Sequence, residues 1–277
     1  MTDTDTTQLN DPDRIPSDEP EGPPGDKPMP LLEHLLELRR RLIWSLVAFV
    51  IAFAGCYAIS KDIYGFLVRP LAAILAEKGG DRGMIYTSMT EAFFTYMKVS
   101  AFAAAFLCFP VWGGQIWAFV APGLYRNERR AFLPFLIATP ILFLAGATLV
   151  YELIMPMAWK FFISFEGTEG GLPIKLEAKV SDYLSLVMTL IFAFGLAFQM
   201  PVLLTLLARV GLITAQSLIE KRRFAIVGVF IFAAVVTPPD ILSQISLAIP
   251  MVLLYELSIV SSRWAERQRE RAAAEEE

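Results

Sequence analysis

The chain has 277 residues, of which 55% are hydrophobic and 19% are charged, and its mean hydropathy is +0.52. This composition is too apolar for an ordinary soluble domain and is typical of a helical membrane protein with several spans. One histidine, two cysteines without a paired spacing and no glycine-rich phosphate-binding motif argue against a multi-histidine metal site, a Ser–His–Asp triad and a nucleotide site.

Residues 1–30 differ in composition from the rest of the chain. They hold seven prolines and most of the acidic excess, and they contain no apolar run of signal-peptide length. We therefore predict a disordered acidic tail rather than a cleaved targeting segment. Residues 263–277 are predicted to form a second charged tail, which leaves 31–262 as the membrane domain.

The first predicted membrane span is 42–59, because a hydrocarbon core of about 30 Å needs about 20 apolar residues. The segment 61–76 that follows has its apolar residues on one helical stripe. It is predicted to be an interfacial helix on the outer surface, broken at Pro70, and the alternative is a loosely packed loop.

The second predicted span is 92–120, and the third is 132–151 with a continuation toward Phe162. The fourth is 183–207, which contains Gln199 and Pro201. The S-x-x-E patterns at 88–91 and 217–220 predict capping boxes before the second and fifth spans.

The last two spans, 224–236 and 242–260, are separated by "TPPD" at 237–240. The fifth has only 13 apolar residues, about 20 Å of helix, which is short for a membrane. Thr237 is predicted to cap the sixth span, with Pro238 in its first turn and Asp240 near its positive end.

Basic residues in the connections predict the orientation. Fourteen fall on the side of the two termini: Arg39–Arg41, Arg126, Arg129, Arg130, Arg209, Lys221–Arg223, Arg263, Arg267, Arg269 and Arg271. Seven lie in the longer loops of the other side. Both termini are therefore predicted to be cytoplasmic, in agreement with six spans.

Four stretches in this order resemble the TatC family, the polytopic receptor subunit of the twin-arginine protein translocase. They are "HLLELRRRL" (34–42), "WAFVAPGLYRNERR" (117–130), "SDYLSLVMTLIFAFGLAFQMPV" (181–202) and "TPPDILSQISLAIPM" (237–251). The resemblance covers about 30–262. It implies an all-α fold of six membrane helices in a curved, glove-like wall, placed in a bacterial cytoplasmic membrane with both termini inside.

The resemblance also implies a non-enzymatic receptor for signal peptides with two adjacent arginines. Such a receptor needs carboxylates on its cytoplasmic face, because a guanidinium and a carboxylate pair through charge-assisted hydrogen bonds. The family's recognition acids fall on Glu37 and Glu128, and the motif neighbours Leu38, Arg39, Arg41 and Arg130 complete the expected site. The alternative for Glu37 is a simple i, i+4 pair with Arg41.

Other positions carry over from the family by the same resemblance. Phe119 falls where relatives have an aromatic residue at the signal-binding surface, with an ordinary interfacial aromatic as the alternative. His34 is expected to be structural. Thr237 and Gln244 are the polar residues expected to contact the helix of single-span TatB- or TatA-like partners. Ala234 stands where some relatives carry methionine.

Gln199 stands where many relatives have a glutamate. It is expected to form hydrogen bonds on the concave face rather than to relay protons, and the alternative is a bond that only stabilises the bundle. Pro201 leaves the carbonyl of Ala197 without its helical donor, and a polar side chain is expected nearby.

The resemblance further implies a hetero-oligomer with several copies, in contact with membrane lipid, driven by the proton gradient, and without a cofactor or nucleic acid. Two other readings stay open. A secondary transporter of a small solute requires inverted repeats and charges at the middle of the membrane. A membrane enzyme requires a catalytic constellation inside the spans.

Overall fold

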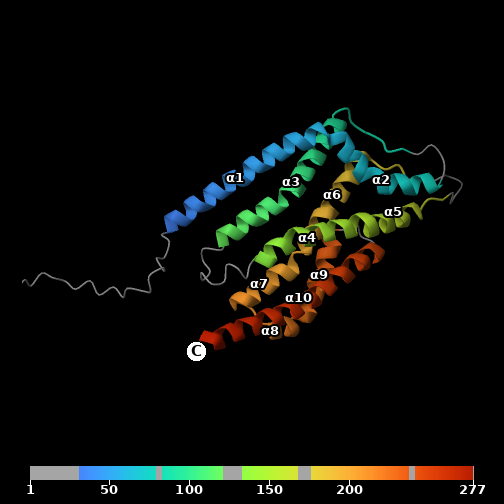
Figure 1. Cartoon of the computed structure of the whole chain (residues 1–277). Helices are drawn as coiled ribbons and strands as arrows, with labels where there is room; N and C mark the ends of the chain where they lie inside the picture. Colours follow the sequence, from blue (N-terminus) through green and yellow to red (C-terminus); the bar gives the residue numbers. More distant parts are fainter. Residues whose placement is uncertain (1–30, 79–82, 121–132, 168–175, 237–240, 277) are drawn as a thin grey trace, which may run out of the picture.

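The computed structural model describes residues 31–78, 83–120, 133–167, 176–236 and 241–276, and it is built from helices (Figure 1). In chain order these are α1 (Leu31–Ala58), α2 (Ser60–Lys78), α3 (Glu91–Val120), α4 (Leu133–Leu149), the π turn η3 (Val150–Ile154), α5 (Met155–Ile163), α6 (Val180–Ala197), α7 (Met200–Val210), α8 (Ala215–Glu220), α9 (Arg222–Val236) and α10 (Ile241–Glu276).

Five segments among the described residues are long and apolar enough to cross a membrane. They are His34–Ala58, Glu91–Ile116, Pro134–Ile163, Val180–Val210 and Gln244–Arg271. The remaining membrane helix, α9, corresponds to the predicted fifth span; it has 15 residues and spans about 22 Å, so it is short, as the sequence predicts. The predicted all-α fold with six membrane helices is confirmed.

Two of the spans are irregular. The third continues without interruption from α4 through η3 into α5, which confirms its predicted continuation toward Phe162. The π turn inserts one extra residue, its own Val150 and Ile154 are buried, and buried residues lie on both sides of it, among them Phe143 and Trp159. The fourth span is divided at Phe198 and Gln199, because Pro201 lies in the first turn of α7 and has no N–H to donate.

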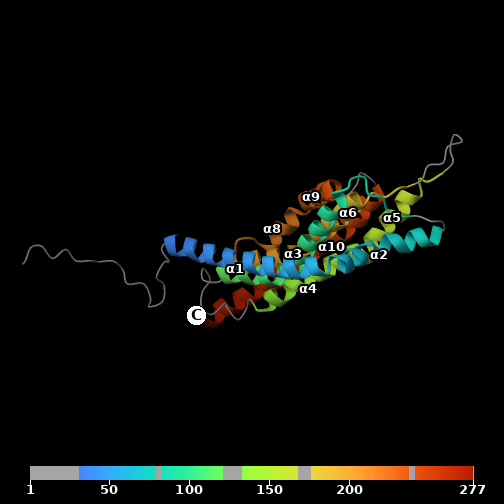
Figure 2. The same ribbon diagram turned by 90° about the horizontal axis from the view of Figure 1, so that it is seen from above.

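The membrane helices form a wall in which α1 packs on α3, α3 packs on α4 and α6, and α7 and α9 pack on α10 (Figures 1 and 2). The buried core lies in the middle of the wall and includes Phe143, Val187, Phe194 and Leu247. The start of α1 and the C-terminal end of α10 lie at one end of the wall (Figure 1). We call this the basic end, because it carries Arg39–Arg41, Arg209, Lys221–Arg223 and Arg263–Arg271.

At the opposite end of the wall, α2 is an amphipathic helix as predicted, with Leu67, Leu71 and Ile74 buried. The predicted break at Pro70 is wrong, since α2 runs through it. A proline leaves the carbonyl four residues earlier without its donor, and here the Tyr151 hydroxyl donates to the Phe66 carbonyl at 2.7 Å. A tertiary hydrogen bond thus replaces the missing helical one.

Both predicted capping boxes are also wrong in detail. Before α3, the Glu91 carboxylate accepts hydrogen bonds from the N–H and the hydroxyl of Thr87, at 2.8 and 3.0 Å, and Ser88 bonds Thr90 instead. At α8, Thr214 is the N-cap and Ser217 is its reciprocal partner three residues later. The first pattern therefore lies at the start of α3, whereas the second lies inside α8 and does not mark the start of α9.

The last helix extends beyond residue 262, the predicted end of the membrane domain, and stays regular to Glu276. It is attached to α8 and to the first residue of α9 by three contacts. Glu266 accepts from the Ala215 N–H at 2.7 Å, the Tyr255 hydroxyl donates to the Leu218 carbonyl at 2.7 Å, and Arg222 pairs with Glu256 at 2.8 Å. The charged C-terminal residues thus continue the membrane helix.

Candidate functional site

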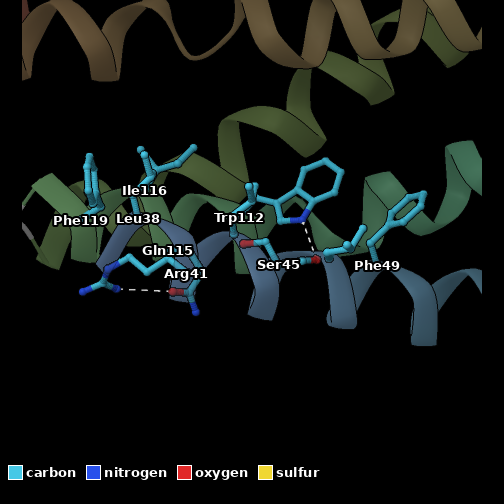
Figure 3. Close-up of a pocket in the computed structure, with 10 residues that line it drawn as sticks. Leu38, Arg41, Ser45, Phe49, Trp112, Gln115, Ile116 and Phe119 are labelled. Atoms are coloured by element: carbon cyan, nitrogen blue, oxygen red, sulfur yellow. Dashed lines mark hydrogen bonds between the residues drawn. The ribbon is translucent and has the colours of Figure 1, made fainter. Parts of the chain in front are cut away.

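The two helices at one edge of the wall, α1 and α3, enclose a groove of about 440 Å³ that starts near the basic end. Its lining is apolar over most of its length (Figure 3). The ten residues that line it, hereafter the α1–α3 groove, are Leu38, Arg41, Leu42, Ser45, Leu46, Phe49, Trp112, Gln115, Ile116 and Phe119. The Trp112 indole donates to the Ser45 carbonyl at 3.4 Å and ties the two helices together.

Polar groups gather at one end of this groove. The Arg41 guanidinium donates from Nε to Oε1 of Glu37 at 3.0 Å, and its Nη2 also donates to the same oxygen. Its Nη1 reaches Oε1 of Gln115, on α3, at 3.4 Å (Figure 3). The i, i+4 pair that the sequence offers as an alternative for Glu37 is therefore formed.

The other carboxylate oxygen of Glu37, Oε2, is buried and has no hydrogen-bond partner among the described residues. Glu37, Arg40, Arg41, Trp44 and Gln115 line a second cavity of about 390 Å³, hereafter the Glu37 pocket. A buried carboxylate oxygen without a donor is costly, because it has lost its water. The geometry therefore leaves one strong acceptor atom without a partner in the described part of the chain, on a residue that lines a cavity.

An aromatic pair lies near the same end. The imidazole of His34 stacks on the ring of Phe119, with centroids 4.2 Å apart and planes at 25°. Phe119 and Leu38 also line the α1–α3 groove, where Leu38 is 44% exposed. His34 thus orients Phe119, consistent with the structural role that the sequence predicts for this histidine.

The combination has a clear chemical preference. A carboxylate oxygen that lacks a donor can accept hydrogen bonds from a guanidinium. The adjoining apolar groove can bury the apolar side chains of a peptide. A peptide that carries both, with the cation first, would meet both surfaces.

The predicted site residues have different outcomes. The structure brings Glu37, Leu38, Arg41 and Phe119 together, while Arg39 is exposed on α1 near them. Glu128, Arg130 and Thr237 lie outside the described residues.

The two predicted glutamines are both bonded within the chain. Nε2 of Gln199 donates to the Thr139 carbonyl of α4 at 2.9 Å and to the Gly195 carbonyl at 3.4 Å. The carbonyl of Ala197, the acceptor suggested by Pro201, is not the one that it bonds. Nε2 of Gln244 donates to the Phe230 carbonyl of α9 at 3.2 Å.

Two residues of the site, Trp112 and Gln115, were not singled out from the sequence. They lie within the second span, and their spacing with Phe119, at i, i+3 and i+7, places all three on one helical face. A polar residue such as Gln115 is unusual inside an apolar run. Its position on the same helical face as Phe119, a predicted binding residue, is the pattern that could have identified this face.

The family comparison agrees with this architecture. Residues 33–250 match the family model described as Sec-independent protein translocase protein (TatC). The proteins of that name from Magnetococcus marinus and Rickettsia prowazekii are each 48% identical to this chain. The first alignment covers 89% of both chains, and the second covers 86% of this chain and 94% of the relative.

Solved structures give the same result. A crystal structure described as the twin arginine translocase receptor TatC superimposes with a TM-score of 0.71 at 36% identity, over 84% of this chain and 99% of that one. The chain therefore belongs to the TatC family and is a multi-pass membrane subunit of a bacterial Sec-independent protein translocase.

Proposed function

We propose that this subunit is the signal receptor of the translocase, and that it binds two adjacent arginines through Glu37 and Glu128. The observation that carries the proposal is the buried, unpartnered Oε2 of Glu37 beside the apolar α1–α3 groove. A guanidinium can fill that acceptor position, and the apolar segment after it can enter the groove. Such binding requires no catalytic group, so the subunit acts as a receptor and not as an enzyme.

The proposal places the basic end in the cytoplasm and the chain in the cytoplasmic membrane. The support is the excess of basic residues at that end, together with the position of both membrane-domain termini there. Signal peptides carried by folded precursors then reach Glu37 from the cytoplasm, where the precursors are synthesised. Export itself draws on the proton gradient across the assembly.

Single-span TatB- and TatA-like subunits are the proposed partners, and α9 is the proposed contact. Four apolar residues of α9 at helical spacing are exposed by 58–79%: Phe224, Val227, Ile231 and Val235. The short helix thereby offers a continuous apolar stripe to a neighbouring membrane helix. The proposed polar contacts to the partner helix are Thr237, Gln244 and Gln199. The amide nitrogens of both glutamines also donate to backbone carbonyls within this chain.

Photo-cross-linking tests the receptor assignment. A precursor with two arginines, carrying a cross-linker beside them, is added to membranes that contain wild type, Glu37→Gln or Glu128→Gln. Each substitution is expected to weaken binding about 10- to 150-fold, the equivalent of one charged hydrogen bond of about 1.5–3 kcal/mol.

The matched control is Glu77→Gln, which neutralises an exposed acid near the end of α2, at the opposite end. Its cross-linking is expected to equal that of wild type. Equal cross-linking in the control and in the Glu37→Gln, Glu128→Gln double variant, with both proteins inserted, would contradict the receptor role.

A further inference from the structure

One of the two carboxylate oxygens that a signal arginine would bind on Glu37 is already occupied by a residue of the same chain. Arg41 lies one helical turn after Glu37 and donates from two nitrogens to its Oε1. Both side chains are 23% exposed, so the pair is largely shielded from water. Arg41 thus presents the same chemical group as the expected ligand to the same carboxylate.

The internal pair is geometrically incomplete. An arginine and a carboxylate form their strongest arrangement when two nitrogens meet two oxygens in parallel. Here both donors converge on Oε1, and Oε2 has no partner among the described residues. An incoming guanidinium that bonds both oxygens therefore has an advantage over the resident one.

A second acceptor for Arg41 lies within reach on the neighbouring helix. Its Nη1 contacts Oε1 of Gln115 at 3.4 Å, a long hydrogen bond that a small movement would shorten. Gln115 lines both the α1–α3 groove and the Glu37 pocket. It can hold the Arg41 guanidinium after that group has left Glu37.

We propose that Arg41 is a resident competitor at Glu37, displaced toward Gln115 when a signal arginine binds. This inference rests on the receptor role proposed above and adds to it an internal competitor that sets the affinity for the ligand. A lysine ammonium is a compact point charge without a planar fork, so it gains less from the two carboxylate oxygens than a guanidinium does. Competition from Arg41 lowers the affinity for both kinds of ligand by the same factor, and the forked geometry of the guanidinium decides between them.

Peptide binding to the purified full chain in lipid nanodiscs tests the displacement. The probes are two fluorescent synthetic peptides that share one apolar segment and carry either Arg-Arg or Lys-Lys before it. Arg41→Met keeps an unbranched, flexible side chain but removes the guanidinium and with it the competitor. It is expected to tighten Arg-Arg and Lys-Lys binding by the same factor of about ten, so that the ratio between the two peptides is unchanged.

Removing a positive charge also weakens the repulsion of any cationic peptide, and Arg40→Met controls for this effect. Arg40 lines the same Glu37 pocket, and no bond between it and Glu37 is found in the described part of the chain. Its substitution is expected to change the affinity for both peptides by one small, equal factor. Equal effects of Arg40→Met and Arg41→Met on both peptides would reduce the role of Arg41 to general electrostatics and overturn the inference.

Variants of Gln115 give an independent readout with Arg41 intact. Gln115→Glu offers Arg41 a stronger acceptor and is expected to tighten Arg-Arg binding, whereas Gln115→Leu removes the acceptor and is expected to weaken it. If Gln115→Glu weakens Arg-Arg binding and Gln115→Leu tightens it, Arg41 does not move from Glu37 to Gln115. If wild type binds both peptides equally, or Glu37→Gln binds like wild type, the receptor role itself is wrong.

Discussion

Glu91 and Ser181, ninety residues apart in the chain, connect the beginnings of two membrane helices. The Glu91 carboxylate in the first turn of α3 accepts a hydrogen bond from the Ser181 N–H in the first turn of α6, at 3.2 Å. The same carboxylate accepts from Thr87. One acid thereby accepts from a free N–H group at the start of α6 and from the N–H of the segment that leads into α3, and the nearby backbone bridge between Ile85 and Lys179 joins the same two connections.

Glu91→Ala is expected to lower the thermal stability of the purified protein and to speed amide hydrogen exchange at Ser181. The reason is that both helix starts lose an acceptor that no neighbouring side chain replaces. Mass-spectrometric hydrogen exchange and a thermal unfolding scan measure the two effects. Glu177→Ala, which removes an exposed acid from the same connection, is the control and should leave both unchanged.

Gly146→Ala is expected to destabilise the protein by about 1–3 kcal/mol through overpacking. A Cβ at Gly146 would lie 2.7 Å from the backbone carbonyl oxygen of Phe194, which cannot move without shifting α6. Thermal unfolding in detergent measures the loss.

The matched control for this prediction is Gly228→Ala in α9, where a Cβ would meet nothing within 4 Å. That substitution should stabilise the helix by about 0.5–1 kcal/mol, because alanine loses less backbone entropy than glycine. Equal changes in stability for the two variants would show that α4 and α6 leave room for a Cβ at Gly146.

Gln199→Leu is expected to cost about 1 kcal/mol of stability, the typical value of one neutral hydrogen bond, because the contact with the Thr139 carbonyl is lost. Gln199→Glu is a sharper test. Its side chain would face two carbonyl oxygens, and only a protonated carboxyl can donate to one of them. The glutamate variant should therefore be more stable in acidic than in alkaline buffer, relative to wild type, and thermal scans across pH measure this.

The orientation is tested by cysteine labelling in a background that lacks Cys56 and Cys108, both buried. A membrane-impermeant maleimide applied to intact cells is expected to reach Glu177→Cys, in the connection before α6. It should miss Gln216→Cys, in α8, until the membrane is permeabilised. The reverse labelling would invert the proposed topology and place Glu37 on the wrong side for its ligand.

The sequence predicts most of the fold because the membrane requires long apolar segments and biased basic residues. Pro70 shows where such reasoning ends. The hydroxyl that completes α2 there comes from Tyr151, 85 residues away, and no local pattern reports a tertiary donor. The capping box at Ser88 failed for a related reason, since Glu91 bonds Thr87 and the distant Ser181 instead.

The candidate site was predictable in part. Glu37 and Phe119 follow from motif resemblance, and the structure places both at one end of the α1–α3 groove. Gln115 was not found, because its importance depends on the register between α1 and α3. That register is set by contacts such as Trp112 with Ser45, and it cannot be read from either helix alone.

The unbroken course of α10 has a mechanical consequence. Its 36 residues form a rod of about 54 Å, of which about 24 Å exceeds the thickness of the hydrocarbon core. A rod of this length acts as a lever, so that a tilt of about 10° moves one end by about 9 Å relative to the other. Because Gln244 joins the far end to α9 and Glu266 joins the near end to α8, a push on the C-terminal arm would change the angle of the α9–α10 hairpin.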